Sequence, residues 1–509
     1  MELDRRACER AARSRDPRFD GRFFIGVKTT GIYCRPICPA PAPRRENVTY
    51  YPTAAAAAAA GLRPCLRCRP EAAPGTPAWM GTSAIVGRAL RLIGEGALDE
   101  AGVEQLAERV GVTDRHLRRL FLAHLGATPL DVAITRRLHF AKKLIDETTL
   151  PFTEVALASG FGSVRRFNGA IQRTYARTPS ALRRLRRPAA EEPHCFRFRL
   201  AYRPPYDWEA LLAFLRARAI PGVEAADSES YRRTIELGGL AGRIVVRPAP
   251  EGPALEVEVQ FGDPRRLLAI VERVRRVFDL GADPAVIASH LGGDRLLGPL
   301  LARHPGLRAP GAWDPFELAV RAILGQQISV AAASTMAGRL AARFGAPGLA
   351  PGERLFPGPD RLAQAPIEEV GVVRVRAEAI RALARAAAGG ALPASLQSIH
   401  GVGEWTEQYV ALRAQGDTDA FPSGDLVLRR VAGARSAREL EQRAEAWRPW
   451  RAYAVILLWQ GATDDADRVV HRDRESGRAA APGRRRGRAA PAGLPRLSTR
   501  ASASRRLGP

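Results

Sequence analysis

The chain has 509 residues, of which 46% are hydrophobic, and a formal net charge of +25. This length exceeds what one hydrophobic core supports and predicts three or four domains of roughly 100–200 residues each, while the charge favours a polyanionic partner, with nucleic acid first. The first ten residues contain no apolar core like that of a signal peptide, and no run of about 20 apolar residues suggests a membrane span, so we expect a cytoplasmic protein.

Four of the six cysteines form two tight pairs near the start of the chain, Cys34 with Cys38 and Cys65 with Cys68. In so long a chain this pattern favours a metal site in a reducing compartment over disulfides. Two such pairs can close a tetrahedral zinc site. On spacing alone, zinc could be no more than a structural brace for a small domain.

The segments around these cysteines, Thr29 to Pro36 and Arg63 to Cys68, resemble the N-terminal domain of the Ada-type adaptive-response regulators. The resemblance implies one zinc ion on the four thiolates, with Cys34 as the sulfur that takes a methyl group from a methylated DNA phosphate. The chemistry is sound, because zinc keeps sulfur deprotonated and a thiolate can attack a methyl carbon. Methylation removes a negative charge from the site and would strengthen DNA binding, as an electrostatic switch. The candidate phosphate contacts, with a solvated basic face as the alternative, are Arg35, Arg44, Arg45, Arg63 and Arg67.

A first helix-turn-helix pattern lies early in residues 81–187. Apolar residues at helical spacing over 103–110 stop at Gly111, and Thr113 or Asp114 caps a second helix. A helix pair that merely packs together is the alternative to a DNA reader.

A second pattern has its turn at Gly160 to Gly162 and a helix that begins after Ser163, with a long helix over 130–147 between the two units. The pair, together with Tyr175 to Pro179, resembles the AraC-type transcription activator domain. The resemblance implies two recognition helices in successive major-groove turns, bound as a monomer, with RNA polymerase as a further partner. The candidate base readers are Arg115, His116, Arg118, Arg119, Arg165, Arg166 and Asn168.

Beyond a linker at 188–195, the residue pattern changes to strand-like alternation. Four runs predict an antiparallel sheet flanked by two helices, namely 196–202, 232–237, 243–247 and 255–259. From Asp314 onward the pattern is almost wholly helical.

Several motifs in this part resemble the helix-hairpin-helix DNA glycosylases: Trp313 to Glu317, Ile323 to Ser329, and the turn Gly401 to Gly403 followed by Trp405 and Thr406. The segment Tyr202 to Trp208 narrows the resemblance to the AlkA-type 3-methyladenine branch. A glycine turn at a helix start lets backbone amides approach a phosphate, although a purely structural turn is the alternative. The DNA contacts implied here are Gln327, at the position of a wedge for the flipped-base gap, with Gly401, Gly403 and Thr406.

Asp425 falls at the catalytic position of that family, at a predicted helix start where an N-cap aspartate is the alternative role. The resemblance implies that the carboxylate stabilises an oxocarbenium-like sugar after the damaged nucleotide is flipped out. The base-pocket positions fall on Phe214, Tyr409, Trp459 and Trp405, whose electron-rich faces would favour a cationic methylated purine. Each of these rings could instead belong to the core. A glycosylase with lyase activity needs an amine, and no lysine occurs after Lys143, so we expect a monofunctional enzyme that leaves an abasic site.

Together these patterns predict a multidomain chain, mainly α with α+β parts. The parts are a small Zn(Cys)4 α/β domain at 1–80, an all-α double helix-turn-helix domain at 81–187, the linker 188–195, an antiparallel-sheet glycosylase subdomain at 196–290, a helix-hairpin-helix catalytic bundle at 291–465 and a disordered basic tail at 466–509.

The implied function is excision of 3-methyladenine and 7-methylguanine type lesions from double-stranded DNA, without a cofactor for the glycosylase, fused to a methylphosphotriester-sensing activator. The alternative is a regulator alone, in which the glycosylase-like part is an inactive DNA clamp. We expect a monomer that is associated with the nucleoid of a bacterium. Because only three of the 78 basic residues are lysine, GC-rich coding is a second source of the arginine excess.

Overall fold

The computed structural model describes residues 3–75, 84–99, 101–186, 192–390 and 392–464. The expected tail at 466–509, the boundary near residue 80 and the first half of the expected linker lie outside these ranges. A compact unit comprises Met1–Ala462. Within the described ranges, no helix has the length and apolarity required to cross a bilayer.

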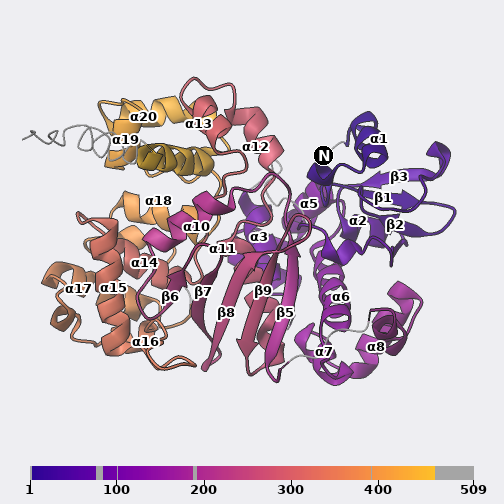
Figure 1. The fold of residues 1–509 in the computed structure, drawn as a ribbon, viewed down its shortest axis with the longest axis horizontal. Coiled ribbons are helices and arrows are strands. Elements are labelled where there is room, and N and C mark those ends of the chain that lie inside the picture. The colour runs from indigo at the N-terminus through magenta and orange to yellow at the C-terminus, as the bar shows by residue number, and fades with distance from the viewer. Residues whose placement is uncertain (1–2, 76–83, 100, 187–191, 391, 465–509) are drawn as a thin grey trace, which may run out of the picture. The chain divides into compact units, whose positions relative to one another are not determined.

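The N-terminal domain is built on a four-stranded sheet of order β3-β1-β2-β4, in which β2 and β4 run parallel and the other pairs antiparallel (Figure 1). The alanine run after Thr53 forms the helix α2, with the Thr53 side chain accepting a hydrogen bond from the Ala56 amide at its start. The elements are α1 Arg5–Ser14, η1 Pro17–Phe19, β1 Phe24–Val27, β2 Ile32–Cys34, η2 Arg45–Asn47, β3 Val48–Tyr51, α2 Ala54–Ala59, β4 Arg63–Pro64 and η3 Pro70–Ala72.

The next part is all helical and contains both predicted helix-turn-helix units. Its helices are α3 Ala84–Gly94, α4 Val103–Val110, α5 Asp114–Leu125, α6 Pro129–Glu147, α7 Phe152–Ala158, α8 Val164–Tyr175 and α9 Pro179–Arg184. Gly111 has a φ of +79°, which allows the sharp turn between α4 and α5. The cap of α5 is Thr113 rather than Asp114, and Ser163 caps α8 as predicted.

Five antiparallel strands in the order β5-β9-β8-β7-β6 form the predicted sheet of the glycosylase part (Figure 1). Alternate side chains of β5 are buried, among them Phe196, Phe198 and Leu200, and residues of α10 and α11 belong to the same apolar core. The elements are β5 Cys195–Ala201, α10 Trp208–Ala217, β6 Glu224–Ala226, β7 Tyr231–Leu237, β8 Leu240–Pro248, β9 Ala254–Phe261, η4 Pro264–Arg266 and α11 Leu267–Val277.

The remainder is the predicted helical bundle, and a last helical stretch covers 451–464. Its elements are α12 Pro284–Leu291, α13 Leu297–Arg303, α14 Pro315–Leu324, α15 Val330–Phe344, α16 Pro359–Leu362, η5 Ile367–Val370, α17 Arg374–Ala386, η6 Leu396–Ser398, α18 Glu404–Arg413, α19 Leu426–Val431, α20 Ala437–Ala444 and η7 Glu445–Trp447. The predicted boundary between 290 and 291 falls inside α12. Because Ile287 and Leu291 of α12 share a core with Leu440 and Leu458, this helix belongs to the bundle.

Candidate functional site

Asp425 is the N-cap residue of α19. Its Oδ1 accepts hydrogen bonds from the backbone amides of Val427 and Leu428, at 2.9 and 3.0 Å. Its own amide donates to the carbonyl of Pro422 at 2.9 Å. The capping role expected from the sequence is therefore present, and it fixes the carboxylate at the positive end of a short helix.

The second carboxylate oxygen of Asp425 has a side-chain partner. The indole Nε1 of Trp405, in the first turn of α18, donates to Oδ2 of Asp425 at 2.9 Å. Both oxygens of the carboxylate are thus held by donors. Three of its roughly four lone-pair sites are occupied, two on Oδ1 and one on Oδ2, which leaves Oδ2 able to accept a further contact.

The four rings expected at the base pocket lie together, although they come from three separate helical segments. Trp405 and Tyr409 stack with centroids 5.1 Å apart and planes 9° apart, and Tyr409 meets Trp459 at 6.0 Å. Phe214 and Trp459 are nearly parallel, at 24° and a centroid separation of 6.5 Å. A flat base stacked between two rings needs a spacing of about 7 Å, which is twice the carbon contact distance of about 3.5 Å. The observed separation is close to this value.

Two arginines lie against these rings and were not anticipated from the sequence. The guanidinium carbon of Arg218 lies 3.7 Å from the centroid of Phe214, and that of Arg413 lies 4.9 Å from it. Arg413 also donates to the Tyr409 hydroxyl at 2.7 Å. Each arginine follows its aromatic by four residues on one helix, a spacing that places both side chains on the same face and is the signal that could have found them.

The guanidinium groups of Arg218 and Arg413 make the electrostatic potential around these rings positive. Burial lowers the pKa of Arg218 to about 10. Burial raises the pKa of Tyr409, but the adjacent charges of Arg413 and Arg218 outweigh it, so that the net pKa lies below the usual 10.0. Further inside, two glutamates are each paired with two arginines: Glu224 and Glu317 with Arg233 and Arg321. Within the part of the chain that the structure describes, these two acids pair with Arg233 and Arg321, and neither Arg218 nor Arg413 forms an ion pair with a carboxylate.

The hairpin glycines have the geometry that a phosphate contact requires. Gly401 has a φ of +85°, and Gly403 is the exposed N-cap of α18 with no side chain over the helix amides. Thr406 does not fit the expected DNA contact, because it is 2% exposed and its amide donates to the carbonyl of Gly403. We correct that assignment: the Thr406 side chain packs inside the bundle.

The wedge position is occupied by an exposed residue with unusual backbone geometry. Gln327 has a φ of +57°, in the left-handed region. Its neighbour Gln326 donates through Nε2 to the carbonyl of Gly401 at 3.0 Å, which joins the wedge loop to the hairpin.

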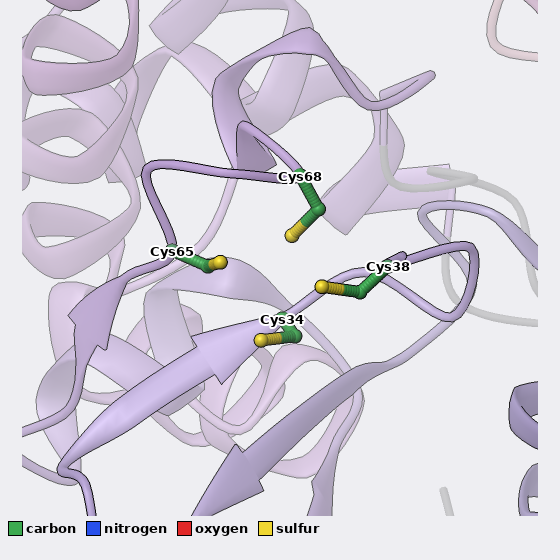
Figure 2. Close-up of side chains that lie close together, drawn as sticks. All are labelled: Cys34, Cys38, Cys65 and Cys68. Carbon is green, nitrogen blue, oxygen red and sulfur yellow. The ribbon is translucent and has the colours of Figure 1, made fainter. Parts of the chain in front are cut away.

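At the other end of the chain, the four cysteines converge, with their sulfur atoms pointing toward one another (Figure 2). All four ligand atoms lie within 4.8 Å of one another. Hydrogen bonds from Cys34 lower the pKa of Cys38 to about 7 and also lower that of Cys65. Hydrogen bonds among the same sulfurs raise the pKa of Cys34 and Cys68. Four sulfurs that converge in this way are the donor set that tetrahedral zinc takes.

Arg35 is a second assignment that the structure corrects. Its side chain is only 8% exposed, pairs with the buried Asp20 through Nε at 2.9 Å, and donates through Nη1 to the carbonyl of Cys68 at 3.0 Å. Its amide donates to Cys68 Sγ at 3.3 Å. Arg35 thus braces the cysteine cluster and has no free donor edge for a phosphate. The other candidates of this group are exposed: Arg44, Arg45, Arg63 and Arg67.

The candidate readers lie on α5 and α8, the second helix of each helix-turn-helix unit. His116 is half-buried, and its Nδ1 accepts a hydrogen bond from Arg119 Nη2 at 2.9 Å. Arg118 lies 3.6 Å from Asp114. The exposed members of the set are Arg115, Arg118, Arg119, Arg165, Arg166 and Asn168.

Comparison with known families assigns most of the chain. Residues 7–71 match the metal binding domain of Ada, 106–185 a helix-turn-helix domain, 197–314 the AlkA N-terminal domain and 320–449 the HhH-GPD superfamily of base excision DNA repair proteins. A Mycobacterium tuberculosis protein, the probable bifunctional transcriptional activator/DNA repair enzyme AlkA, is 40% identical over 90% of this chain and 97% of its own length. This chain belongs to that family of bifunctional activator/DNA repair enzymes.

Two further relatives each match one part of this chain. DNA-3-methyladenine glycosylase 2 of Escherichia coli is 34% identical over 52% of this chain and 96% of its own length. The bifunctional transcriptional activator/DNA repair enzyme Ada of E. coli is 43% identical over 23% of this chain and 31% of its own length. This chain therefore carries an Ada-type zinc site on Cys34, Cys38, Cys65 and Cys68. Its helix-turn-helix and base-excision-repair domains make DNA its partner.

Proposed function

We propose that the glycosylase part of this chain hydrolyses the N-glycosidic bond of alkylated purines, of the 3-methyladenine and 7-methylguanine type, and leaves an abasic site. The carrying observation is Asp425, held by backbone and indole donors beside four contacting aromatic rings. A flipped base would enter between Phe214 and Trp459, and the gap it leaves in the duplex would be filled by Gln327.

In this mechanism the bond between the sugar and the purine breaks and its electron pair leaves with the base. Methylation at N3 or N7 has already made the purine cationic, so the base leaves as a neutral molecule without a general acid. Asp425 stabilises the positive charge that develops on the sugar, and water adds to the sugar carbon and releases a proton to solvent. The hairpin amides at Gly401 and Gly403 hold a backbone phosphate during these steps.

The zinc domain is proposed to act on a different methyl group. Zinc on the four sulfurs would keep Cys34 as a thiolate. The Cys34 sulfur forms a bond to the methyl carbon of a DNA methylphosphotriester while the carbon–oxygen bond breaks, and the phosphate oxygen keeps the electron pair. The transfer neutralises one thiolate, which lowers the repulsion between the domain and DNA and favours binding at a promoter, with Arg45 and Arg67 among the phosphate contacts.

We further propose that the exposed residues of α5 and α8 read the promoter from successive major-groove turns, and that the bound monomer recruits RNA polymerase. Such activity would associate the protein with the bacterial nucleoid.

The test is release of 3-methyladenine from methylated DNA by the wild type and by Asp425→Asn, with a borohydride trap in parallel. We expect release by the wild type only and no covalent adduct, because the bundle contains no lysine. Release by neither protein would favour the rival function, a regulator with an inactive clamp. Equal release by both would remove Asp425 from the mechanism, and an adduct through the bundle would show lyase chemistry.

A further inference from the structure

The catalytic carboxylate of this chain is held by a side chain as well as by a helix end. Oδ1 of Asp425 takes the amides of Val427 and Leu428, and Oδ2 takes the indole N–H of Trp405 at 2.9 Å. A carboxylate that is fixed at both oxygens cannot rotate about its terminal torsion without losing a hydrogen bond.

The same helix supports the loop that carries the acid. Gln408, nearly one turn after Trp405 on α18, accepts a hydrogen bond from the Phe421 amide through Oε1 at 3.0 Å. Two side chains of α18 therefore hold the segment from Phe421 to Asp425. Because α18 starts at Gly403, the helix that begins at the hairpin turn also fixes the acid.

Trp405 itself has little freedom. Its ring stacks on Tyr409 with planes 9° apart, and its half-buried side chain has its polar edge on Asp425. From sequence we expect Trp405 to be a wall of the base pocket. With one face on Tyr409 and the N–H on the acid, its contacts point to a different role.

We propose that Trp405 is a positioning residue for Asp425, which sets the carboxylate against the sugar through the indole N–H. This inference rests on the proposed glycosylase activity. The hydrogen bond acts on the acid and not on the base, so its loss slows bond cleavage for every lesion by one common factor. A ring that stacked on the base would instead change binding and cleavage by a factor that depends on the size and charge of that base.

The test compares full-length wild type with Trp405→Phe, which keeps a ring on Tyr409 and removes the donor, and Trp405→His, which restores an N–H donor. Single-turnover excision is measured on DNA that carries 3-methyladenine, 3-methylguanine or 7-methylguanine. We expect Trp405→Phe to be slower by about 10²-fold on all three, the order of loss that follows a small misplacement of a reacting group. Trp405→His recovers part of that rate, and affinity for DNA with a stable abasic analogue is unchanged.

A matched control exists in the same bundle. The indole Nε1 of Trp447 donates to Asp294 Oδ2 at 2.8 Å, and Trp447 is not one of the four rings expected at the pocket. Phenylalanine at 447 keeps an aromatic ring against Phe421. Trp447→Phe removes an equivalent bond and should lower the melting temperature while excision at a temperature well below melting stays within about twofold of the wild type.

These outcomes separate the glycosylase activity from the positioning role of Trp405. A wild type that releases no base would contradict the glycosylase activity itself. With an active wild type, a full rate in Trp405→Phe, a loss that differs between lesions, or an equal loss in Trp447→Phe overturns the positioning role.

Discussion

Arg218 gives a quantitative prediction about lesion choice. Its guanidinium lies 3.7 Å from the Phe214 centroid, on one face of that ring. A base on the opposite face would lie about 3.5 Å farther, so two positive charges would be separated by about 7 Å when the base is methylated. At an effective dielectric constant of about 20, that repulsion is roughly 2 kcal/mol, comparable to the attraction of about 0.5–2 kcal/mol between a cation and one aromatic ring.

Replacing Arg218 with methionine keeps an unbranched apolar stem and removes the charge. We expect the ratio of kcat/KM for 7-methylguanine, which is cationic in DNA, to that for the neutral purine hypoxanthine to rise roughly thirtyfold, the equivalent of about 2 kcal/mol. The control is Arg216→Met, on the exposed side of the same helix, which should leave the ratio unchanged.

The assay is excision under kcat/KM conditions on matched duplexes that differ only in the lesion, with melting temperatures to confirm folding. A folded Arg218→Met protein whose ratio stays level or falls would refute the reasoning, since the charge would then have no influence on the bound base. A rise in both variants would point to the net charge of the protein rather than to this site.

Three further outcomes follow from the geometry. Burial raises the pKa of Asp279 from 3.8 to about 6. The folded chain therefore binds this proton more tightly than the unfolded chain, and the free energy of unfolding falls as the pH rises between those values. In Asp279→Asn, the urea midpoint of unfolding should fall less between pH 4 and pH 7 than it does in the wild type. Cys38→Ala should lose the one equivalent of zinc that metal analysis finds in the wild type, whereas Cys195→Ala, which lies outside the four-sulfur cluster, should keep it; equal zinc in both would contradict the site. Arg67→Ala should make the negative slope of log binding constant against log salt less steep by about 0.9, without a change in melting temperature. Arg35→Ala leaves the buried Asp20 unpaired and should destabilise the zinc domain by about 3–5 kcal/mol. The opposite pattern would reverse the roles of the two arginines.

Periodicity and capping residues predicted the elements well, because these signals are local. The helix start at Ser163, the turn at Gly111 and the alternating strand β5 all follow from residues a few positions apart. The family resemblance then placed the candidate sites, and the structure brings the four pocket rings together.

The features that the sequence did not reveal depend on where a side chain points in the fold, not on which residue it is. Arg35 and Arg67 both lie next to zinc-site cysteines in the sequence, yet of these two only Arg67 is exposed. The guanidinium of Arg35 is buried because it donates to Asp20, a residue that is distant in the sequence. Thr406 follows the hairpin in the primary structure, but the helix turns its side chain into the bundle. Which edge of Trp405 meets Asp425 likewise depends on how α18 and α19 pack, and no local pattern encodes that packing.

The backbone at Gln327 also limits how far this protein could be stabilised. A side chain at a φ of +57° costs of order 1 kcal/mol or more relative to glycine, which adopts that conformation freely. A design that sought thermal stability alone would therefore place glycine at 327, and would remove the exposed side chain that we propose fills the gap left by a flipped base. At this one position, durability of the fold and access to damaged DNA impose opposite demands.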